Sequence, residues 1–321
     1  MKRRDFIKAA AIAAPAISLF PADLSGIERK AVPGKIEKRS LGRTGEMLSM
    51  IGFGGIIVMN ATPDEATESV KLAIDSGINY FDVAPTYGDA EVKLGPALEP
   101  YRKNVFLACK TTQRNKTGAL EELEKSLKNL RTDHFDLYQF HAVTTMEDVE
   151  KIFAPGGAME AYQEAKKAGK IRFIGFSAHS VEASLAMMDR YDFDTILFPV
   201  NYVTWYAGDF GAQVLERAKQ KNMGILALKA MAKGPWPKDA PDKAKYPKCW
   251  YEPLTTTDDI KMGLRFTLSH PVTAALTPGD TGLFKIALNM KNSIKPLKVK
   301  EILAIKEKGL AGNPLFKYPR T

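Results

Sequence analysis

The stretch Phe81-Asp82-Val83-Ala84-Pro85-Thr86-Tyr87-Gly88 places a carboxylic acid and a phenol five residues apart, at and just beyond the end of a strand-like run. Pro85 and Gly88 are residue types that commonly end a strand and form a loop. An amphipathic helix is expected to begin near Ala90. The segment therefore predicts one β/α unit with polar side chains at the carboxyl end of its strand.

The same alternation of strand and helix recurs along the chain. Strands rich in Val, Ile, Leu and Phe are expected at residues 49–55, 79–83, 105–110, 135–140, 171–177, 194–199, 224–229 and 272–277. Helices are expected to begin near Asp64, Ala90, Thr117, Ala158, Ser180, Gly211, Thr257 and Thr281. Apolar strands separated by helices are typical of a parallel sheet that helices cover.

Eight such units predict an α/β protein with a closed (β/α)8 TIM barrel, a fold that commonly occupies about 250 residues. A short N-terminal β-hairpin is expected within residues 36–50, and a peripheral C-terminal helix over residues 297–308. The alternative is an open doubly wound sheet, which would carry a Gly-x-Gly-x-x-Gly loop after its first strand. Gly52-Phe53-Gly54-Gly55 does not have that spacing, which favours the barrel.

Composition narrows the class of function. The 321 residues have the apolar and charged fractions of an ordinary globular protein. The formal net charge of +9 is dispersed along the chain rather than gathered beside aromatic residues, so no nucleic-acid binding is expected. Cys109 lies in a predicted strand and Cys249 in a long loop, so neither a disulfide nor a metal site is expected.

The N-terminus has the pattern of an export signal. Lys2-Arg3-Arg4-Asp5-Phe6-Ile7-Lys8 precedes an alanine-rich apolar run that is too short for a confident membrane span. The paired arginines resemble a twin-arginine signal, which directs the export of folded proteins. The alternative is a basic N-terminal helix of a cytosolic protein.

This pattern predicts three segments. Residues 1–22 are expected to be a twin-arginine-type signal peptide, residues 23–35 a linker and residues 36–321 the barrel. The protein would then be periplasmic or otherwise exported, with the twin-arginine translocase as its partner during export. No stable membrane insertion is expected after cleavage.

In a barrel, the loops that follow the strands meet on one face, where barrel enzymes have their active sites. Four polar side chains are expected to meet there: Asp82, Tyr87, Lys110 and His141. An ammonium lowers the pKa of a nearby tyrosine, a carboxylate keeps a lysine charged, and a histidine can orient a carbonyl group. Such a set can protonate a carbonyl oxygen while hydride reaches its carbon, or catalyse the reverse reaction. None of these groups stores electrons, so the hydride must come from a cofactor.

These segments resemble the aldo-keto reductases, a family of NADP(H)-dependent (β/α)8 oxidoreductases. The resemblance covers about residues 36–292, and its most specific segments are residues 81–88, Leu107-Ala108-Cys109-Lys110-Thr111 and Asp136-Leu137-Tyr138-Gln139-Phe140-His141. The resemblance implies that Tyr87 is the general acid/base and that Lys110 tunes its pKa. It also implies that Asp82 holds Lys110 and that His141 orients the carbonyl.

The resemblance implies a cofactor site that departs from the family pattern in its strands. Ser177 matches a serine that contacts the nicotinamide amide, whereas Leu197 replaces the usual glutamine. Leu228 replaces a tyrosine that stacks on the nicotinamide in many members, so apolar contact remains but stacking is lost.

The last β/α unit also matches the family pattern at some positions and departs from it at others. The helix that begins at Thr281 has an N-terminus suited to a phosphate. Lys285 lies where the family has an arginine for the 2′-phosphate, and Asn289 matches an asparagine that contacts adenine. Leu288 replaces a glutamate, and Asp280 would repel a phosphate unless it caps the helix. The residues expected to contact NADP(H), or alternatively NAD(H), are Gly54, Gly55, Ser177, Asn201, Leu228, Pro278, Gly279, Lys285 and Asn289.

The segment 234–257 contains five prolines and several aromatic residues, which favours a loop that covers a substrate. The expected walls of the substrate pocket are Trp205, Tyr206 and Trp236. The leading hypothesis is an exported oxidoreductase acting on a small aldehyde, ketone, sugar or alcohol. The alternatives are a cofactor- or ligand-binding barrel that has lost turnover, and an isomerase or lyase that uses Lys110 as a Schiff-base amine.

Overall fold

The computed structural model describes residues 26–291 and 293–319, and the predicted signal peptide at residues 1–22 lies outside them. Eight of the described strands form a closed parallel barrel in the order β10-β13-β4-β5-β6-β7-β8-β9. They are β4 (Ile51–Gly54), β5 (Tyr80–Asp82), β6 (Phe106–Thr111), β7 (Phe135–Val143), β8 (Ile171–Ala178), β9 (Thr195–Pro199), β10 (Gly224–Leu228) and β13 (Ala274–Leu276). The predicted fold class is confirmed.

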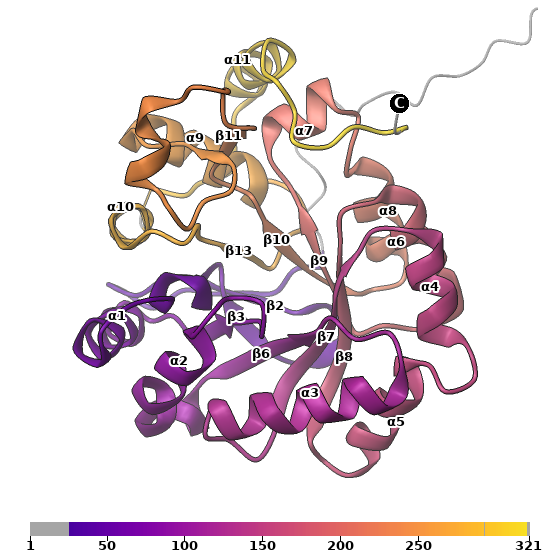
Figure 1. Ribbon diagram of the computed structural model, residues 1–321. Coiled ribbons are helices and arrows are strands. Elements are labelled where there is room, and N and C mark those ends of the chain that lie inside the picture. Colours follow the sequence, from indigo (N-terminus) through magenta and orange to yellow (C-terminus); the bar gives the residue numbers. More distant parts are fainter. Residues whose placement is uncertain (1–25, 292, 320–321) are drawn as a thin grey trace, which may run out of the picture.

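Helices surround the strands (Figure 1). They are α1 (Pro63–Asp75), α2 (Ala90–Leu98), α3 (Lys116–Asn129), α4 (Met146–Phe153), α5 (Ala158–Lys167), α6 (Val181–Arg190), α7 (Tyr202–Ala207), α8 (Ala212–Gln220), α9 (Thr257–Leu268), α10 (Thr281–Asn289) and α11 (Val299–Leu310). The eight predicted starts of the barrel helices agree with these bounds to within one residue, and the peripheral helix expected over residues 297–308 begins two residues later, at Val299. The short helices α4 and α7 were not predicted. Within the described residues, no helix is long and apolar enough to cross a membrane.

A small antiparallel sheet closes the N-terminal end of the barrel. It consists of β1 (Arg29–Lys30), β2 (Lys38–Ser40) and β3 (Met47–Ser49). The predicted hairpin is therefore present, and β1 adds a third strand inside the segment that was expected to be a linker. Leu41 and Leu48 of this sheet region are fully buried, and they pack into the interior of the barrel.

The interior of the barrel changes from apolar to polar along three neighbouring strands. Tyr80, Ala108 and Leu137 belong to one buried cluster at the N-terminal half of the barrel. Side chains two residues apart on a strand lie on the same face. The next inward-facing residues are therefore Asp82 on β5, Lys110 on β6 and Gln139 on β7, which are all buried. Strand alternation thus brings a carboxylate, an ammonium group and an amide together in the mouth of the barrel.

Two glycines of the N-terminal hairpin offer a test of how closely this sheet packs on the barrel. Gly42 and Gly45 both have left-handed backbones, with φ of 51° and 79°. A Cβ atom on Gly42 would lie 2.3 Å from the backbone nitrogen of Gly224, whereas a Cβ atom on Gly45 would meet no atom within 4 Å.

We expect Gly45→Ala to lower the free energy of unfolding by about 1 kcal/mol, because only backbone strain is added. Gly42→Ala should cost about 2 kcal/mol more, because the hairpin must also move away from β10. Urea unfolding followed by circular dichroism compares the two variants. Equal losses of stability would show that the hairpin does not pack tightly against β10.

Candidate active site

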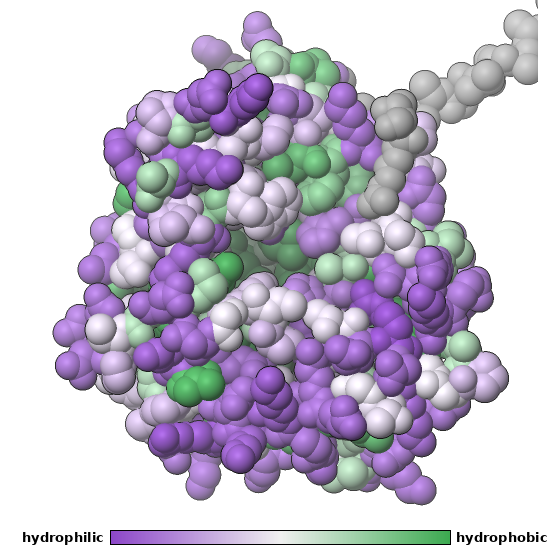
Figure 2. Space-filling view, viewed as in Figure 1, coloured by the Kyte–Doolittle hydropathy of each residue, from purple (hydrophilic) through white to green (hydrophobic). Residues whose placement is uncertain are grey.

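A cavity of about 120 Å³ lies among the carboxyl ends of the barrel strands. Its walls are formed by Gly54, Ile56, Asp82, Tyr87, Leu197, Leu228, Lys229, Lys248, Trp250, Tyr251, Leu276, Thr277, Pro278 and Gly279. Figure 2 shows a hollow near the middle of the molecule, with hydrophobic residues inside and mostly hydrophilic residues around it. A larger open hollow of about 1270 Å³ lies at the opposite end of the barrel and holds none of the four predicted catalytic residues.

The floor of the cavity contains a buried ion pair. The Nζ atom of Lys110 donates hydrogen bonds to Oδ1 of Asp82 and, at 3.0 Å, to the backbone oxygen of Val83. The other carboxylate oxygen of Asp82 accepts hydrogen bonds from the Tyr80 hydroxyl at 3.1 Å and from Nε2 of Gln139 at 2.9 Å. Burial acts to lower the pKa of Lys110, but the Asp82 carboxylate together with Tyr87 and Cys109 outweighs it, so the net pKa is raised. Lys110 is therefore a fixed positive charge.

Tyr87 lies between this ion pair and the predicted histidine. Its ring centroid is 5.7 Å from Nζ of Lys110, and its ring meets that of His141 edge to face, with 6.2 Å between the centroids. Burial raises the pKa of Tyr87 and outweighs the lowering that Lys110 causes. The net direction thus differs from the lowering expected from the ammonium alone, and Tyr87 holds its proton at neutral pH.

An irregularity at the end of β7 presents His141 to the site. The register of β7 against β8 shifts between Phe140 and Val143, and Ala142 has a left-handed φ of 52°. The backbone nitrogen of Ala142 donates a hydrogen bond of 2.8 Å to Oγ of Ser177. Because a bulge changes the direction of the following side chain, this turn sets where the imidazole of His141 points.

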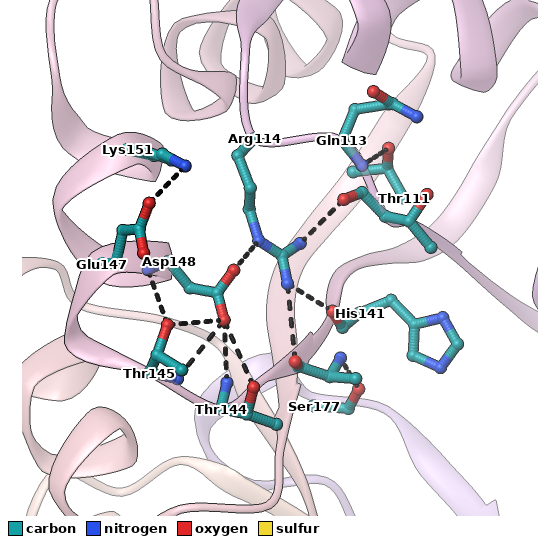
Figure 3. Close-up of polar contacts among 12 residues, drawn as sticks. Thr111, Gln113, Arg114, His141, Thr144, Thr145, Glu147, Asp148, Lys151 and Ser177 are labelled. Atoms are coloured by element: carbon teal, nitrogen blue, oxygen red, sulfur yellow. Dashed lines mark hydrogen bonds and ion pairs between the residues drawn. The ribbon is translucent and has the colours of Figure 1, made fainter.

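Arg114, in the loop between β6 and α3, holds the same turn from its other side (Figure 3). Its Nη2 atom donates a hydrogen bond of 2.7 Å to the backbone oxygen of His141, and its Nε atom pairs with Asp148 at 2.9 Å. The second oxygen of Asp148 accepts from Thr144 and Thr145 at the N-terminus of α4. In Figure 3 the imidazole of His141 points away from Arg114. Arg114 is thus a positioning residue that sequence reasoning missed.

The imidazole of His141 is neutral in this environment. Burial, and then the positive charges of Lys110 and its neighbours, lower the pKa of His141 to about 3. Among the described residues, its buried Nδ1 atom has no hydrogen-bond partner. A neutral imidazole can donate one hydrogen bond to a carbonyl oxygen without adding a net charge.

A second groove, of about 640 Å³, lies beside the cavity and shares Lys248 with it. Thr281 and Lys285, at the start of α10 and one turn later, also line this groove. Asp280 caps α10 by accepting a hydrogen bond of 2.8 Å from the backbone nitrogen of Leu283. The two lysines and the helix N-terminus provide donors suited to the phosphates of a dinucleotide. The residues present therefore fit a nicotinamide cofactor that extends from the cavity into the groove.

The other predicted cofactor residues lie in different surroundings. Gly54, Leu228, Pro278 and Gly279 line the cavity. The remaining four do not line the cavity or the groove: Gly55 packs against Val83 just after β5, Ser177 holds the turn after His141, Asn201 caps α7 through Thr204, and Asn289 is exposed at the end of α10.

None of the three aromatic residues predicted to form the substrate pocket lines the cavity. Trp205 packs on His270, with ring centroids 4.2 Å apart, and Tyr206 packs on Phe266. Trp236 donates a hydrogen bond of 2.8 Å from its indole nitrogen to the backbone oxygen of Cys249. Trp205 and Tyr206 thus pack against α9 and the residues just after it, and Trp236 is bonded within the long loop.

Two other aromatic residues of the long loop line the cavity instead. β11 (Ala232–Gly234) pairs with β12 (Glu252–Pro253), and this pairing folds the loop back over the barrel. Trp250 and Tyr251, just before β12, thereby line the cavity. Phe316, near the C-terminus, lies 6.2 Å from Trp250 between ring centroids. The prolines and aromatics of the segment predicted a covering loop, but they did not show which rings face inward.

Comparison with known proteins agrees with this architecture. A family model described as "Aldo/keto reductase family" matches residues 50–253, which is more than half of the chain. Aldo-keto reductase YhdN of Bacillus subtilis is 32% identical over 218 residues, covering 62% of this chain and 63% of that protein. L-galactose dehydrogenase of Arabidopsis thaliana is 27% identical over 216 residues, covering 62% of this chain and 67% of that protein.

A solved structure shares the fold. The holo form of an aldo-keto reductase from Bacillus halodurans superposes with a TM-score of 0.67 at 22% sequence identity. The superposition covers 88% of this chain and 98% of the other.

The environment of His141 can be tested without turnover. In protein with isotope-labelled histidines, we expect the His141 ring to keep the NMR shifts of a neutral imidazole from about pH 8 to about pH 5. Arg114→Met should alter these shifts and raise the pKa of His141, because a positive charge and a backbone hydrogen bond are lost.

Lys151→Met is the matched control, because Lys151 forms an exposed ion pair with Glu147 on the same helix as Asp148. His141 should behave in this variant as it does in the wild type. A His141 ring that gains its proton above about pH 6 in the wild type would contradict this description of the site.

Proposed function

Because the chain belongs to the aldo/keto reductase family, we propose that it is an NADP(H)-dependent oxidoreductase that interconverts a small aldehyde, ketone or sugar with its alcohol. The observation that carries this proposal is the buried pair of Lys110 and Asp82 beside Tyr87, at the floor of a cavity. The matched segments cover only about two thirds of the curated relatives, so the activity is argued from the site itself.

The geometry suits acid/base catalysis at a carbonyl group. A bound nicotinamide cofactor supplies the hydride. Tyr87 donates its proton to the carbonyl oxygen, and the neutral imidazole of His141 donates a hydrogen bond to the same oxygen. Lys110 then stabilises the tyrosinate that remains, because its positive charge is already in place before the proton leaves. In the oxidation of an alcohol, Tyr87 accepts the proton and Asp82 keeps Lys110 charged throughout.

The groove beside α10 supports the cofactor part of the proposal. Lys285 would bind the 2′-phosphate that distinguishes NADP(H) from NAD(H), and Lys248 would lie closer to the cavity, toward the pyrophosphate. Asp280 caps the helix with its carboxylate, and the positive end of the helix offsets part of the negative charge that a phosphate would meet there. NAD(H) remains the alternative cofactor if Lys285 contributes little.

Export is a further part of the proposal. The basic and apolar pattern of residues 1–22 supports a twin-arginine signal and a periplasmic location. Passage through the twin-arginine translocase in the folded state would allow the cofactor to cross the membrane already bound.

A second function is a cofactor- or ligand-binding barrel without turnover. Leu197 and Leu228 favour it, because both line the cavity where the family has polar or aromatic contacts to the nicotinamide. A Schiff base on Lys110 is disfavoured, because the amine is protonated and bound by Asp82. The arrangement of Asp82, Lys110 and His141 around Tyr87 supports the oxidoreductase more strongly than the binding barrel.

Tyr87→Phe separates turnover from binding. We expect kcat for reduction of small aldehydes to fall by at least about 1000-fold, because the proton donor is removed. The Kd for NADPH, measured by its fluorescence, should change by less than about threefold. A variant that keeps a tenth of the wild-type rate would exclude Tyr87 as the acid, and a folded wild type that binds neither NADPH nor NADH would exclude the reductase.

Lys285→Met tests cofactor preference. We expect the Kd for NADPH to rise by about tenfold while the Kd for NADH changes little, because only NADPH carries the 2′-phosphate. Lys300→Met is the control, since Lys300 is an exposed lysine on α11 that does not line the groove. Equal weakening of both cofactors, or none, would contradict a phosphate contact at Lys285.

A further inference from the structure

Glu91, the second residue of α2, is a buried acid that the mechanism above does not use. Only 4% of Glu91 is exposed, yet among the described residues it takes part in no ion pair, and its three hydrogen-bond partners are neutral. Burying a charge without a counter-ion is costly unless donors bind it. The role of this acid therefore follows from the elements that its oxygens join.

The two carboxylate oxygens of Glu91 join α2 to α3 and to β6. Oε1 accepts a hydrogen bond of 2.7 Å from the hydroxyl of Ser126 and one of 3.4 Å from Sγ of Cys109. Oε2 accepts a hydrogen bond of 2.9 Å from Nδ2 of Asn129. Burial, and then the carboxylate itself, raise the pKa of the Cys109 thiol well above its ordinary value, so the thiol keeps the proton that it donates. One side chain on α2 thus connects two residues of α3 and one of β6.

Helices α2 and α3 are in close contact at the same place. Gly95 follows Glu91 by about one turn, and a Cβ atom on Gly95 would lie 2.3 Å from the backbone oxygen of Asn129. Asn129 therefore contacts α2 through both its side chain and its backbone. Because hydrogen bonds weaken steeply when their geometry is distorted, a shift of α2 along α3 would weaken the contacts of Glu91.

The first turn of α2 also fixes Tyr87. The backbone nitrogen of Tyr87 donates to the backbone oxygen of Ala84, and its backbone oxygen accepts from the nitrogen of Ala90, both at 3.0 Å. The side chain of Asp89 does not cap α2, and it accepts a hydrogen bond of 2.7 Å from the backbone nitrogen of Asn60 instead. The start of α2 is therefore held by contacts from outside the helix, and Tyr87 follows it when it moves.

Cys109 connects the same acid to the ammonium beside Tyr87. Side chains alternate between the two faces of a strand, so Cys109 points outward to the helices while Lys110 points into the barrel. Glu91 thus binds the outer face of β6 at the residue just before Lys110, whose Nζ atom lies 5.7 Å from the ring centroid of Tyr87. The chain segments that carry the phenol and the ammonium are both bound to one carboxylate.

We propose that Glu91 is a positioning residue for Tyr87. By joining the first turn of α2 to α3 and to the outer face of β6, it keeps the phenol at its distance from the ammonium of Lys110. Catalysis depends on such distances, and a misplacement of about 1 Å can lower a rate by about 100-fold. This inference rests on the proposed function, because it concerns the acid of that reaction.

Exchanging the donor and the acceptor tests the proposal. Glu91→Gln sets two amides against each other, and Asn129→Asp sets two carboxylates against each other. Each change should lower kcat for reduction of 4-nitrobenzaldehyde by about 10- to 100-fold, while the Kd for NADPH changes by less than about threefold. The double variant places an amide at position 91 and a carboxylate at position 129, which can bond again. Its kcat should return to within about threefold of the wild-type value, because the two residues are directly coupled.

Gly42→Ala is the control for stability. It strains the hairpin at the opposite end of the barrel, so it should lose stability in urea yet keep the wild-type kcat. A folded Asn129→Asp with the wild-type kcat would overturn the proposal. Equal losses of kcat and NADPH affinity, or a double variant no more active than the single ones, would also overturn it. If Asn129→Asp does not fold, Glu91→Gln provides the same comparison.

The position of Tyr87 can also be followed without turnover. In protein with isotope-labelled tyrosines, the NMR ring signals of Tyr87 are those that vanish in Tyr87→Phe. They should shift in Asn129→Asp and return in the double variant, whereas the signals of Tyr191, at the end of α6, should stay unchanged. Unchanged Tyr87 signals in Asn129→Asp would overturn the positioning role even in an active enzyme. Shifted signals in a protein that binds neither NADPH nor NADH would uphold the positioning role and exclude the reductase.

Discussion

A carboxylate and an ammonium buried together in the mouth of the barrel constrain the rest of the site. Asp82 and Lys110 are each only 1% exposed, and a buried charge without its partner would be strongly destabilising. The pair is tolerated because Tyr80 and Gln139 satisfy the second carboxylate oxygen. Strands β5, β6 and β7 must therefore keep their register, since a shift by one residue would turn these side chains outward. Tyr87 consequently lies next to a charge that cannot move away, which the proposed proton transfer requires.

Most of the fold could be predicted because its signals are local. Runs of branched and aromatic residues mark the barrel strands, and capping residues mark many helix starts, such as Asn115 before α3 and Asp280 before α10. The helices α4 and α7 have only eight and six residues, which is too short for a clear apolar period. The edge strand β1 has two residues and depends on pairing with β2, so its own sequence contains no signal.

The candidate catalytic residues could be proposed from the sequence because the strand ends of a barrel converge on one face, whatever path the loops take. The site residues that the sequence did not reveal depend on how the loops fold in three dimensions. Arg114 acts through the backbone of His141, so its role follows from a bulge that no motif marks. Trp250 and Lys229 meet only because β11 and β12 fold the long loop back over β10. Trp205 and Trp236 are aromatic residues of the same kind, yet Trp205 packs on His270 and Trp236 donates to the backbone of Cys249.

The central claim is that this site transfers hydride from a nicotinamide to a carbonyl carbon while Tyr87 supplies the proton. The most direct measurement uses NADPH that carries deuterium on the transferring face of its nicotinamide ring, together with a panel of small aldehydes. The account predicts an alcohol with one deuterium on the former carbonyl carbon, as read by mass spectrometry. An unlabelled alcohol, or no alcohol from folded protein that binds NADPH, would contradict it.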